Sequence, residues 1–412
     1  MYKRWIESNI REALLDTPVV LLHGARQTGK STLAQQIGRD LGAAHRTLDD
    51  ETTRAAAISD PYSFLADGDG LLIVDEVQRV PELFIAIKRL VDENRRPGRY
   101  LLTGSANVFL LPRLNESLAG RLEVTQLHPL AQGELEGIAP DLLDRLFNPD
   151  LAQALTNHAP LAATNPLERI VAGGFPESLV RSERRRQAWF DAYTAALLTR
   201  DVRDISQIVD LSALPRLLTL LSSRVMSLVN HADLSRTLDI PQTTLKRYFA
   251  LLEAMFMVSL LPAWTRNVGR RLIKAPKLLL LDTGITASRL GWTSGYLAQN
   301  RGSIGFILEQ FVTLELLRLA ATNLSNYGVY HYRTASNQEV DVVVESRLGT
   351  VLGFEVKASL SVSASDFNGL RALQEDAGQG FHAGFVVYSG ADFVRFGERL
   401  WAIPIAALWN TI

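Results

Sequence analysis

The chain has 412 residues, no cysteine and a formal net charge of −1 at pH 7, and 47% of its residues are hydrophobic and 21% charged. The length allows two or three domains, and the composition is that of a globular protein with full hydrophobic cores. The lack of cysteine excludes a disulfide framework, thiolate metal sites and a cysteine nucleophile, and the near-zero charge argues against one large basic surface.

The opening segment, MYKRWIESNIREALLD, is amphipathic and has no apolar h-region, so it does not predict a signal peptide. The longest nearly uncharged apolar stretch, residues 254–264, is too short to cross a bilayer. We therefore expect a cytoplasmic protein without a membrane partner.

Between residues 17 and 127, short apolar runs alternate with helical patterns, which predicts a parallel sheet covered by helices. The apolar runs are PVVLLH (18–23), HRTLD (45–49), LLIVD (71–75), RYLLTG (99–104) and LEVTQL (122–127). LLIV is apolar throughout, as expected of a strand that is buried on both faces. We expect an α/β domain over residues 1–135.

The segment GARQTGKS, residues 24–31, follows the first strand and opens a helix. It is a complete G-x-x-x-x-G-K-[ST] pattern in the context that a P-loop requires, and the alternative is an ordinary glycine-containing turn. Glycines let backbone N–H groups close on phosphate oxygens, and the helix N-terminus adds its positive end. The pattern predicts a site for ATP and Mg²⁺, in which Lys30 neutralises the β/γ-phosphates and the Ser31 hydroxyl ligates the ion. The expected nucleotide-binding residues are Gly24, Ala25, Arg26, Gln27, Thr28, Gly29, Lys30, Ser31 and Thr32.

Asp75 and Glu76 end the apolar strand LLIVDE. A carboxylate at the carboxyl edge of a parallel sheet lies beside the phosphate site, so Asp75 is predicted to ligate Mg²⁺. Glu76 could orient or deprotonate the attacking water, which indicates hydrolysis rather than binding alone. The alternative is a charged strand end before a turn.

The next strand ends in TGSAN, where Ser105 or Asn107 could sense the γ-phosphate or hold the water. Arg121, at the start of the last strand, could be a finger that stabilises transition-state charge on a neighbouring subunit's nucleotide. That role would require a homo-oligomer. Arg113 competes for it, and a solvated surface charge is the alternative for both arginines.

The five strands, the order of these motifs, the polar end of the fourth strand and the late arginine resemble the AAA+ ATPase superfamily over residues 1–135. The layout of nearly the whole chain resembles a prokaryotic family in which such an ATPase precedes a C-terminal domain of formerly unknown function. The segments that support the resemblance are GARQTGKS, DEVQ (75–78), LTGSAN (102–107), SLAGR (117–121), GGFPE (173–177), TRDV (199–202), LDTG (281–284) and the opening stretch.

Residues 136–225 are mostly helical in pattern and are expected to form a linker region. Residues 226–300 look like a winged helix, because a helix, a turn at 239–241, a second helix and a strand follow one another in 234–261. The second helix starts at Pro241 and shows Thr243, Thr244, Lys246 and Arg247, residue types that contact phosphates and base edges.

The run TRNVGRRLIKAPK, residues 265–277, follows this segment and holds five basic residues. It could be a wing that lies along DNA or RNA. Two alternatives remain: a winged helix that only packs against other domains, and a basic wing that is merely solvated.

Residues 301–412 predict the element order α-β-β-β-α-β. The expected elements are an amphipathic helix at 302–322, strands at 327–334, 339–346 and 350–359, a helix at 363–376 and a strand at 382–389. This order resembles the core of the PD-(D/E)xK nuclease superfamily, a restriction-endonuclease-like α/β fold.

Two carboxylates and an ammonium stand on these predicted strands, and Glu355 and Lys357 share one strand face because they are two residues apart. The resemblance implies that Asp341 and Glu355 bind Mg²⁺ together with the Val356 carbonyl. It also implies that Lys357 positions or activates the attacking water and that Glu309 is an accessory carboxylate. The nominal proline of the motif is absent before Asp341. The alternative is an inherited fold whose charges pair with each other or bind a partner.

Two functions are consistent with these features. In the first, Mg²⁺-dependent ATP hydrolysis is coupled to nucleic-acid binding or processing through the nuclease-like domain, and the set Glu309, Asp341, Glu355 and Lys357 favours it. In the second, the ATP state controls a protein interface, and the nuclease-like domain is a catalytically inactive docking platform. The near-zero net charge favours the second function.

Overall fold

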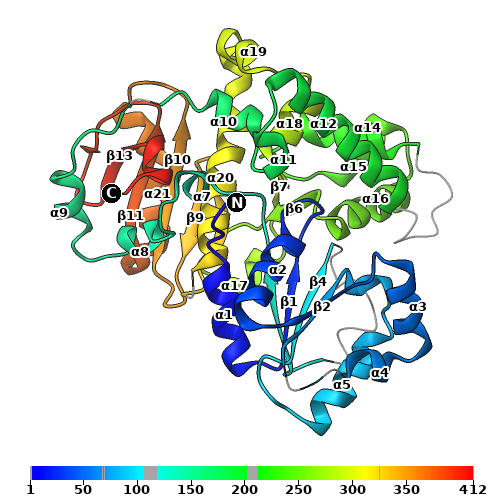
Figure 1. Cartoon of the computed structure of the whole chain (residues 1–412). Helices are drawn as coiled ribbons and strands as arrows, with labels where there is room; N and C mark the ends of the chain where they lie inside the picture. The colour runs from blue at the N-terminus through cyan, green and yellow to red at the C-terminus, as the bar shows by residue number, and fades with distance from the viewer. Residues whose placement is uncertain are drawn as a thin grey trace. The chain divides into compact units, whose positions relative to one another are not determined.

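The computed structural model describes residues 2–66, 68, 70–105, 118–162, 164–201, 212–323 and 325–411. The chain forms two compact units, drawn from blue to red along the sequence in Figure 1. The N-terminal unit comprises Arg4–Pro129 and Leu252–Met257. The C-terminal unit comprises Met1–Lys3, Leu130–Leu251 and Val258–Ile412.

The N-terminal unit is built on a parallel sheet in the strand order β2-β3-β4-β1-β5. Its strands are β1 (Val19–His23), β2 (Ala44–Thr47), β3 (Leu72–Asp75), β4 (Tyr100–Gly104) and β5 (Leu122–Gln126). Its helices are α1 (Glu7–Asp16), α2 (Lys30–Leu41), α3 (Glu51–Ser59), α4 (Pro61–Leu65), η1 (Val77–Arg79) and α5 (Leu83–Glu93). All five strands predicted from the apolar runs are confirmed.

Both faces of the central strands β3, β4 and β1 are buried, which explains why these strands are mostly apolar, whereas the edge strands β2 and β5 are partly exposed. Val19 and Leu21 of β1 pack in one core with residues of α3, α4 and α5. Val20 and Leu22, which point to the opposite face, pack with residues of α1 and α2. The loop after β1 is therefore fixed at the carboxyl edge of a rigid three-layer unit.

The C-terminal unit begins with a mostly helical region, as predicted. Its helices are α7 (Gln132–Glu136), α8 (Leu142–Leu146), α9 (Leu151–Thr156), α10 (Leu167–Ala172), α11 (Pro176–Leu179), α12 (Glu183–Ala196), η3 (Leu197–Asp201) and α14 (Leu214–Ser222). The sequence motif TRDV ends at Val202, which lies outside the described residues.

A helix–turn–helix and a two-stranded antiparallel sheet follow. The elements are α15 (His231–Leu238), α16 (Gln242–Ala254), β6 (Val258–Leu261), α17 (Val268–Arg271) and β7 (Lys277–Leu280). Asp239, between the two helices, has the left-handed backbone that ends α15. Three further helices, α18 (Thr283–Arg289), α19 (Ser294–Gln299) and η4 (Arg301–Ser303), lead to the last region.

The last region contains a six-stranded mixed sheet in the order β12-β13-β11-β10-β9-β8 (Figure 1). Its strands are β8 (Gly328–Arg333), β9 (Glu339–Glu345), β10 (Val351–Lys357), β11 (Phe381–Tyr388), β12 (Val394–Arg395) and β13 (Leu400–Pro404). Its helices are α20 (Ile304–Thr322), η5 (Ala364–Phe367), α21 (Asn368–Ala377), η6 (Gly378–Gly380) and η7 (Ile405–Trp409). The predicted order α-β-β-β-α-β is present, and β12 and β13 extend the sheet beyond it.

One expectation about this region was wrong. The helix α20 is not amphipathic, because it buries polar positions such as Gln310, Glu315 and Arg318 along with its apolar residues. The sheet on one side and α8, α10, α18 and η7 elsewhere surround it. A helix that is covered on most sides cannot be recognised by an apolar stripe.

The segments GGFPE and LDTG, which had no assigned role, meet at the buried carboxylate of Asp282. Its Oδ2 accepts a hydrogen bond from the Gly174 N–H (2.8 Å), and its Oδ1 accepts one from the Gly284 N–H (2.9 Å). Gly173 has a φ of 66°, and a Cβ there would lie 2.0 Å from Asp282 Oδ1. Burial raises the pKa of Asp282, and the guanidinium of Arg318, 3.6 Å away, opposes that rise. These two motifs therefore form one structural junction.

None of the helices within the described residues is long and apolar enough to cross a membrane.

Replacing Asp282 by alanine should lower the free energy of unfolding of the C-terminal unit by roughly 3 kcal/mol, because two buried N–H groups lose their acceptor. Urea denaturation followed by tryptophan fluorescence measures this loss. Asp150→Ala removes an exposed aspartate of the same unit and should change stability by less than about 0.5 kcal/mol. Equal losses in the two variants would contradict the role of the junction.

Candidate functional site

The loop between β1 and α2 has the backbone that a phosphate site requires. Gly24 has a φ of 146°, and a Cβ there would lie 2.4 Å from the Leu127 carbonyl oxygen. Gly29, with a φ of 99°, is the N-cap of α2, and Gln27 also has a positive φ of 61°. These conformations turn the loop tightly, so that its N–H groups and the first turn of α2 surround a single position that suits a phosphate group.

Lys30 is buried at the centre of this loop. Its Nζ donates hydrogen bonds to the carbonyl oxygens of Gly24 (3.0 Å) and Ala25 (2.8 Å). Burial lowers the pKa of Lys30 to about 8, and the nearby carboxylates of Glu76 and Asp75 oppose this effect. An ammonium held by neutral carbonyls is well placed to exchange these bonds for bonds to phosphate oxygens.

Arg4 holds the loop from the start of the chain, a contact that the sequence did not predict. Its Nη1 donates to the carbonyl oxygen of Thr28 (2.7 Å), and its Nη2 donates to that of His128 (2.6 Å). The side chain is buried, so both bonds are protected from water. Arg4 thus ties the P-loop to the segment that follows β5.

The predicted Mg²⁺ ligands are brought together. The Ser31 hydroxyl donates to Asp75 Oδ1 over 2.8 Å, although 44 residues separate them. Thr103 of β4, the strand between β1 and β3, also donates to Asp75 Oδ1 and accepts from the Glu76 N–H at 3.2 Å. A hydroxyl and a carboxylate are hard oxygen donors that fit Mg²⁺. Thr103 was missed, although it lies in the quoted segment LTGSAN.

Glu76 and Ser105 are also neighbours, a contact that the sequence analysis did not specify. The Ser105 hydroxyl donates to Glu76 Oε2 (2.8 Å), and Gln78 donates to both residues. Glu76 has a left-handed backbone with a φ of 58°, which is rare for a residue other than glycine and typical of functional sites. Gln78 is a further residue of this cluster that the sequence did not single out. Asn107 and Arg113 lie outside the described residues.

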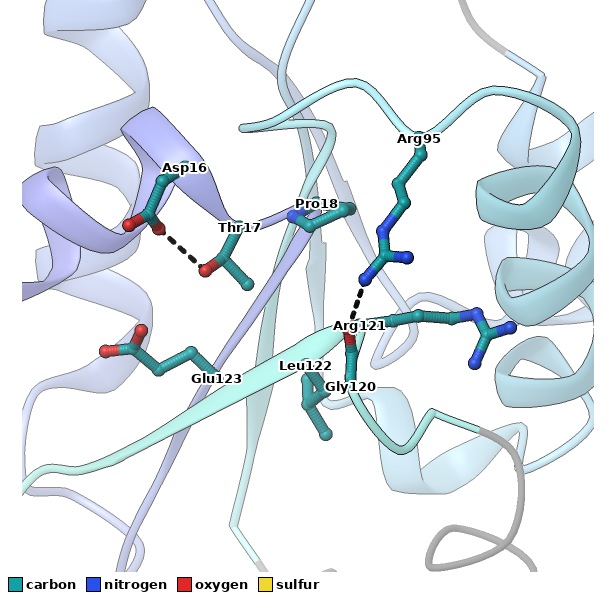
Figure 2. Close-up of a pocket in the computed structure, with 8 residues that line it drawn as sticks. All are labelled: Asp16, Thr17, Pro18, Arg95, Gly120, Arg121, Leu122 and Glu123. Atoms are coloured by element: carbon teal, nitrogen blue, oxygen red, sulfur yellow. Dashed lines mark hydrogen bonds between the residues drawn. The ribbon is translucent and has the colours of Figure 1, made fainter.

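Arg121 lies at the opposite end of the sheet from the P-loop of its own chain. It directly precedes β5, whose first residue, Leu122, pairs with the first residue of β1. Its Nη2 lies 2.5 Å from Asp92 Oδ1 of α5. Arg121 also lines a cavity of about 330 Å³, and Figure 2 draws the residues that line it. The residues of this cavity are Asp16, Thr17, Pro18, Arg95, Gly120, Arg121, Leu122 and Glu123. Arg121 therefore cannot contact a nucleotide in the P-loop of the same chain.

In the C-terminal unit, the predicted carboxylates do converge, but around a cation that the sequence did not reveal. Lys277 of β7 places its Nζ 2.5 Å from Glu309 Oε1, 2.6 Å from Glu339 Oε1 and 3.7 Å from Asp341 Oδ1. The Lys277 side chain is only 2% exposed. We call Glu309, Glu339, Asp341 and Glu355 the acidic centre.

The other half of the acidic centre lies on β10. Lys357 Nζ donates to Glu355 Oε1 over 2.9 Å, and the Val356 N–H donates to Asp341 Oδ2 over 2.8 Å. Glu355 Oε2 is buried and has no hydrogen-bond partner among the described residues. The structure thus brings the predicted carboxylates and Lys357 together. Lys357 binds Glu355, and Lys277 binds the other three carboxylates of the acidic centre.

Burial and mutual repulsion shift the titration of this centre. Burial, and then the charge of Asp341, raise the pKa of Glu355 to about 7. The same two causes raise the pKa of Glu309 well above its usual range, against the attraction of Lys277. The carboxyl groups of Glu309 and Glu355 therefore resist ionisation in the folded chain.

The middle region presents part of the predicted basic surface. On α16, Thr243, Lys246 and Arg247 are exposed and Thr244 is half-buried. In the run 265–277, however, two of the five basic residues bind carboxylates of the C-terminal sheet. Arg271 forms two bonds to Glu345 (2.5 and 2.8 Å), and Lys277 lies in the acidic centre. The exposed cations of this run are Arg266, Arg270 and Lys274.

Family models match three parts of the chain. A model described as an AAA domain matches residues 16–136, and models of two domains of unknown function, DUF8612 and DUF4143, match residues 165–295 and 304–408. The AAA match coincides with the parallel sheet, the P-loop and the Ser31–Asp75 pair described above. The N-terminal unit is therefore a P-loop ATPase domain of the AAA class.

The uncharacterized proteins Rv2008c of Mycobacterium tuberculosis and Mb2031c of Mycobacterium bovis are each 31% identical to this chain over 411 residues. Each alignment covers 99% of this chain and 85% of the mycobacterial protein. The chain belongs to the same family as these two proteins.

Solved structures give more distant similarities. The Walker-type ATPase PABY2304 of Pyrococcus abyssi is 14% identical, covers 70% of this chain and 96% of its own, and has a TM-score of 0.42. The Holliday junction branch migration motor RuvB of Thermotoga maritima is 20% identical, covers 62% of this chain and 85% of its own, and has a TM-score of 0.27. The AAA assignment depends on the family model and the site geometry instead.

The raised pKa of Glu355 predicts that the C-terminal unit loses stability as the pH rises. Between the usual pKa of 4.5 and about 7, the folded state binds more protons than the unfolded state, so the free energy of unfolding falls across this window. The expected loss that is due to Glu355 is about 3 kcal/mol, at about 1.4 kcal/mol per pH unit.

Urea denaturation at pH 5 and pH 8 measures this loss. Glu355→Gln should reduce the pH dependence by that amount, whereas Glu398→Gln, at an exposed glutamate of the same unit, should leave it unchanged. Identical pH dependence in Glu355→Gln and the unmodified chain would contradict the shifted pKa.

Proposed function

We propose that this chain hydrolyses ATP with Mg²⁺ at the P-loop. The observation that carries the proposal is the direct contact of Ser31 with Asp75 beside the buried ammonium of Lys30. Ser31 and Asp75 would hold Mg²⁺, which supplies positive charge to the β- and γ-phosphates. Lys30 and the N–H groups of residues 24–32 would bind the phosphates and orient the γ-phosphate toward Glu76.

Glu76 would act as the base or the orienting group for the attacking water. Its carboxylate is bound by Ser105 and Gln78, and these bonds fix where its oxygens lie. Ser105, at the end of the strand next to β3, would in turn respond to the γ-phosphate. Asn107 keeps its predicted role as an alternative group for this purpose.

Arg121 would act on the nucleotide of a neighbouring copy in a homo-oligomer. Its position at the amino edge of the sheet, away from its own P-loop, supports a role between copies rather than within one. Asp92 holds its guanidinium at the surface of the unit.

Replacing Lys30 by alanine should lower the ATP hydrolysis rate a hundredfold or more, on the order of the loss of a main transition-state donor. Replacing Glu76 by glutamine should lower the rate by about 10² to 10⁴ while leaving nucleotide binding intact, because only proton transfer is lost. Phosphate release and binding of a fluorescent ATP analogue measure the two effects.

Arg39→Ala is the matched control, since it removes an exposed cation from the same helix, α2. Hydrolysis by Lys30→Ala at the rate of the unmodified chain would refute the ATPase assignment.

We further propose that ATP hydrolysis is coupled to the binding or processing of DNA or RNA by the C-terminal unit. The supporting observation is the helix–turn–helix of α15 and α16 with the β6–β7 sheet, which is the order of a winged helix. The exposed Thr243, Lys246 and Arg247 lie on α16, the second helix of the pair, which reads nucleic acid in such folds.

A second candidate function is a switch, in which the ATP state controls a protein interface and the C-terminal sheet is an inactive docking platform. The Lys277 ammonium among the carboxylates favours this candidate over nuclease activity. Nuclease action by Glu309, Asp341, Glu355 and Lys357 with Mg²⁺ would require the ion to compete with this ammonium.

Replacing Lys246 and Arg247 together by alanine should weaken binding to duplex DNA at least tenfold and reduce the salt dependence of binding by about two counterions, because two phosphate contacts are lost. Fluorescence anisotropy between about 50 and 200 mM salt, the range over which such phosphate contacts weaken, measures both quantities.

The pair Lys88 and Arg89 on α5 has the same two residue types in the same order, so Lys88→Ala with Arg89→Ala is a charge-matched control. If the unmodified chain binds neither DNA nor RNA, or if both double variants bind equally well, the switch becomes the better description.

A further inference from the structure

The acidic centre has the spacing of a metal site but already contains a cation of the chain. Carboxylate oxygens of Glu309, Glu339 and Asp341 lie within 4.8 Å of one another. The Lys277 ammonium lies within 2.6 Å of the first two and 3.7 Å from the third. An ammonium has three donors and no acceptor, which suits a cluster of carboxylate oxygens.

Lys277 is anchored through its main chain on both sides. On one side it pairs with Leu261 of β6, and on the other it forms a bridge with Leu228. The next residue, Leu278, donates its N–H to the Ser227 carbonyl oxygen over 2.9 Å. Withdrawing the ammonium by moving β7 would break these hydrogen bonds, so the side chain is a fixed part of the centre.

Apart from Oε2 of Glu355, which is buried without a hydrogen-bond partner among the described residues, other oxygens of the centre also have partners within the chain. Glu355 binds Lys357, and Glu339 has a second cation, Arg333, at 3.7 Å. The second oxygen of Asp341 accepts the Val356 N–H. Each of the four carboxylates therefore has a lysine or arginine nitrogen within 4 Å.

We propose that the Lys277 ammonium takes the place of the divalent ion that the nuclease-like element order implies. An ion on Asp341 would lie beside the fixed charge of Lys277, 3.7 Å from that carboxylate, whether the ion is also bound by Glu355 or by Glu309 and Glu339, and the two cations would repel each other at short range. The residues present thus do not fit a metal ion in this fold, and the centre is an ion-pair cluster that joins β7 to the C-terminal sheet. This inference does not depend on whether the N-terminal unit hydrolyses ATP.

Manganese binding to the full-length chain tests the inference. The parent for this test is the Lys30→Ala variant without nucleotide, so that the P-loop contributes little to Mn²⁺ binding. Bound Mn²⁺ is counted by titration followed by electron paramagnetic resonance. Adding Lys277→Met should create one Mn²⁺ site that is at least tenfold tighter than any in the parent. Adding Asp341→Asn to that variant should remove the site. Lys274→Met, at the exposed lysine three residues earlier, is the control and should create none.

Thermal unfolding keeps the test decisive if Lys277→Met folds poorly. With four carboxylates and fewer cations, this variant should be less stable than the parent, and saturating Mn²⁺ should raise its unfolding temperature by about 5 °C or more while leaving the parent unchanged. Lys277→Arg keeps the charge and should show neither the new site nor the rescue.

Two results would overturn the inference. The first is an Asp341-dependent Mn²⁺ site in the parent, which would show that Lys277 does not exclude the ion. The second is a Lys277→Met variant that neither binds Mn²⁺ nor is stabilised by it, which would show that the lysine does not stand in for a metal.

Discussion

A charge that leaves water has to be compensated inside the fold, and this constraint determines the three sites that matter most in this protein. At the P-loop, the buried ammonium of Lys30 is held by two backbone carbonyls and faces the carboxylates of the β3 end. At the motif junction, Arg318 compensates the buried carboxylates of Asp282 and Glu315. In the C-terminal sheet, Lys277 compensates the acidic centre.

The three sites differ in whether the buried cation remains available to a ligand. Carbonyl oxygens bind Lys30 without neutralising it, so its charge remains available to an incoming phosphate. Arg318 and Lys277 are instead bound by carboxylates, two for Arg318 and three for Lys277, so neither cation is available to an incoming anion. A buried cation that is bound by carboxylates of the chain, such as Lys277, therefore has a structural role. A buried cation that is bound only by neutral carbonyl oxygens, such as Lys30, is suited to bind an anionic ligand.

The sequence predicted what is encoded locally. The P-loop was recognised because its residues are contiguous and their order is dictated by the backbone conformation at Gly24 and Gly29. Asp75 and Glu76 were found because parallel strands bring their carboxyl ends to one edge. Thr103 could have been found by the same argument, since β4 ends at that edge and its polar residues had already been noted.

Contacts between distant segments were not predictable in this way. Arg4 reaches residues 24 and 124 positions away, and no periodicity distinguishes it from other arginines of the first segment. Lys277 was assigned to a solvated or nucleic-acid-binding wing, because its run is basic and a single chain gives no sign that one lysine turns inward. The buried polar face of α20 was hidden for a related reason, since a helix that is covered on most sides has no apolar stripe.

Two buried arginines that the sequence did not single out each bind main-chain carbonyl oxygens within their own unit. Within the N-terminal unit, Arg4 binds the carbonyl oxygens of Thr28 and His128. Within the C-terminal unit, Arg318 binds the carbonyl oxygen of Leu130 over 3.2 Å, and Glu315 accepts the Gln132 N–H over 2.7 Å. In both units a charged side chain from a distant part of the sequence holds the main chain, and no local pattern encodes such a contact.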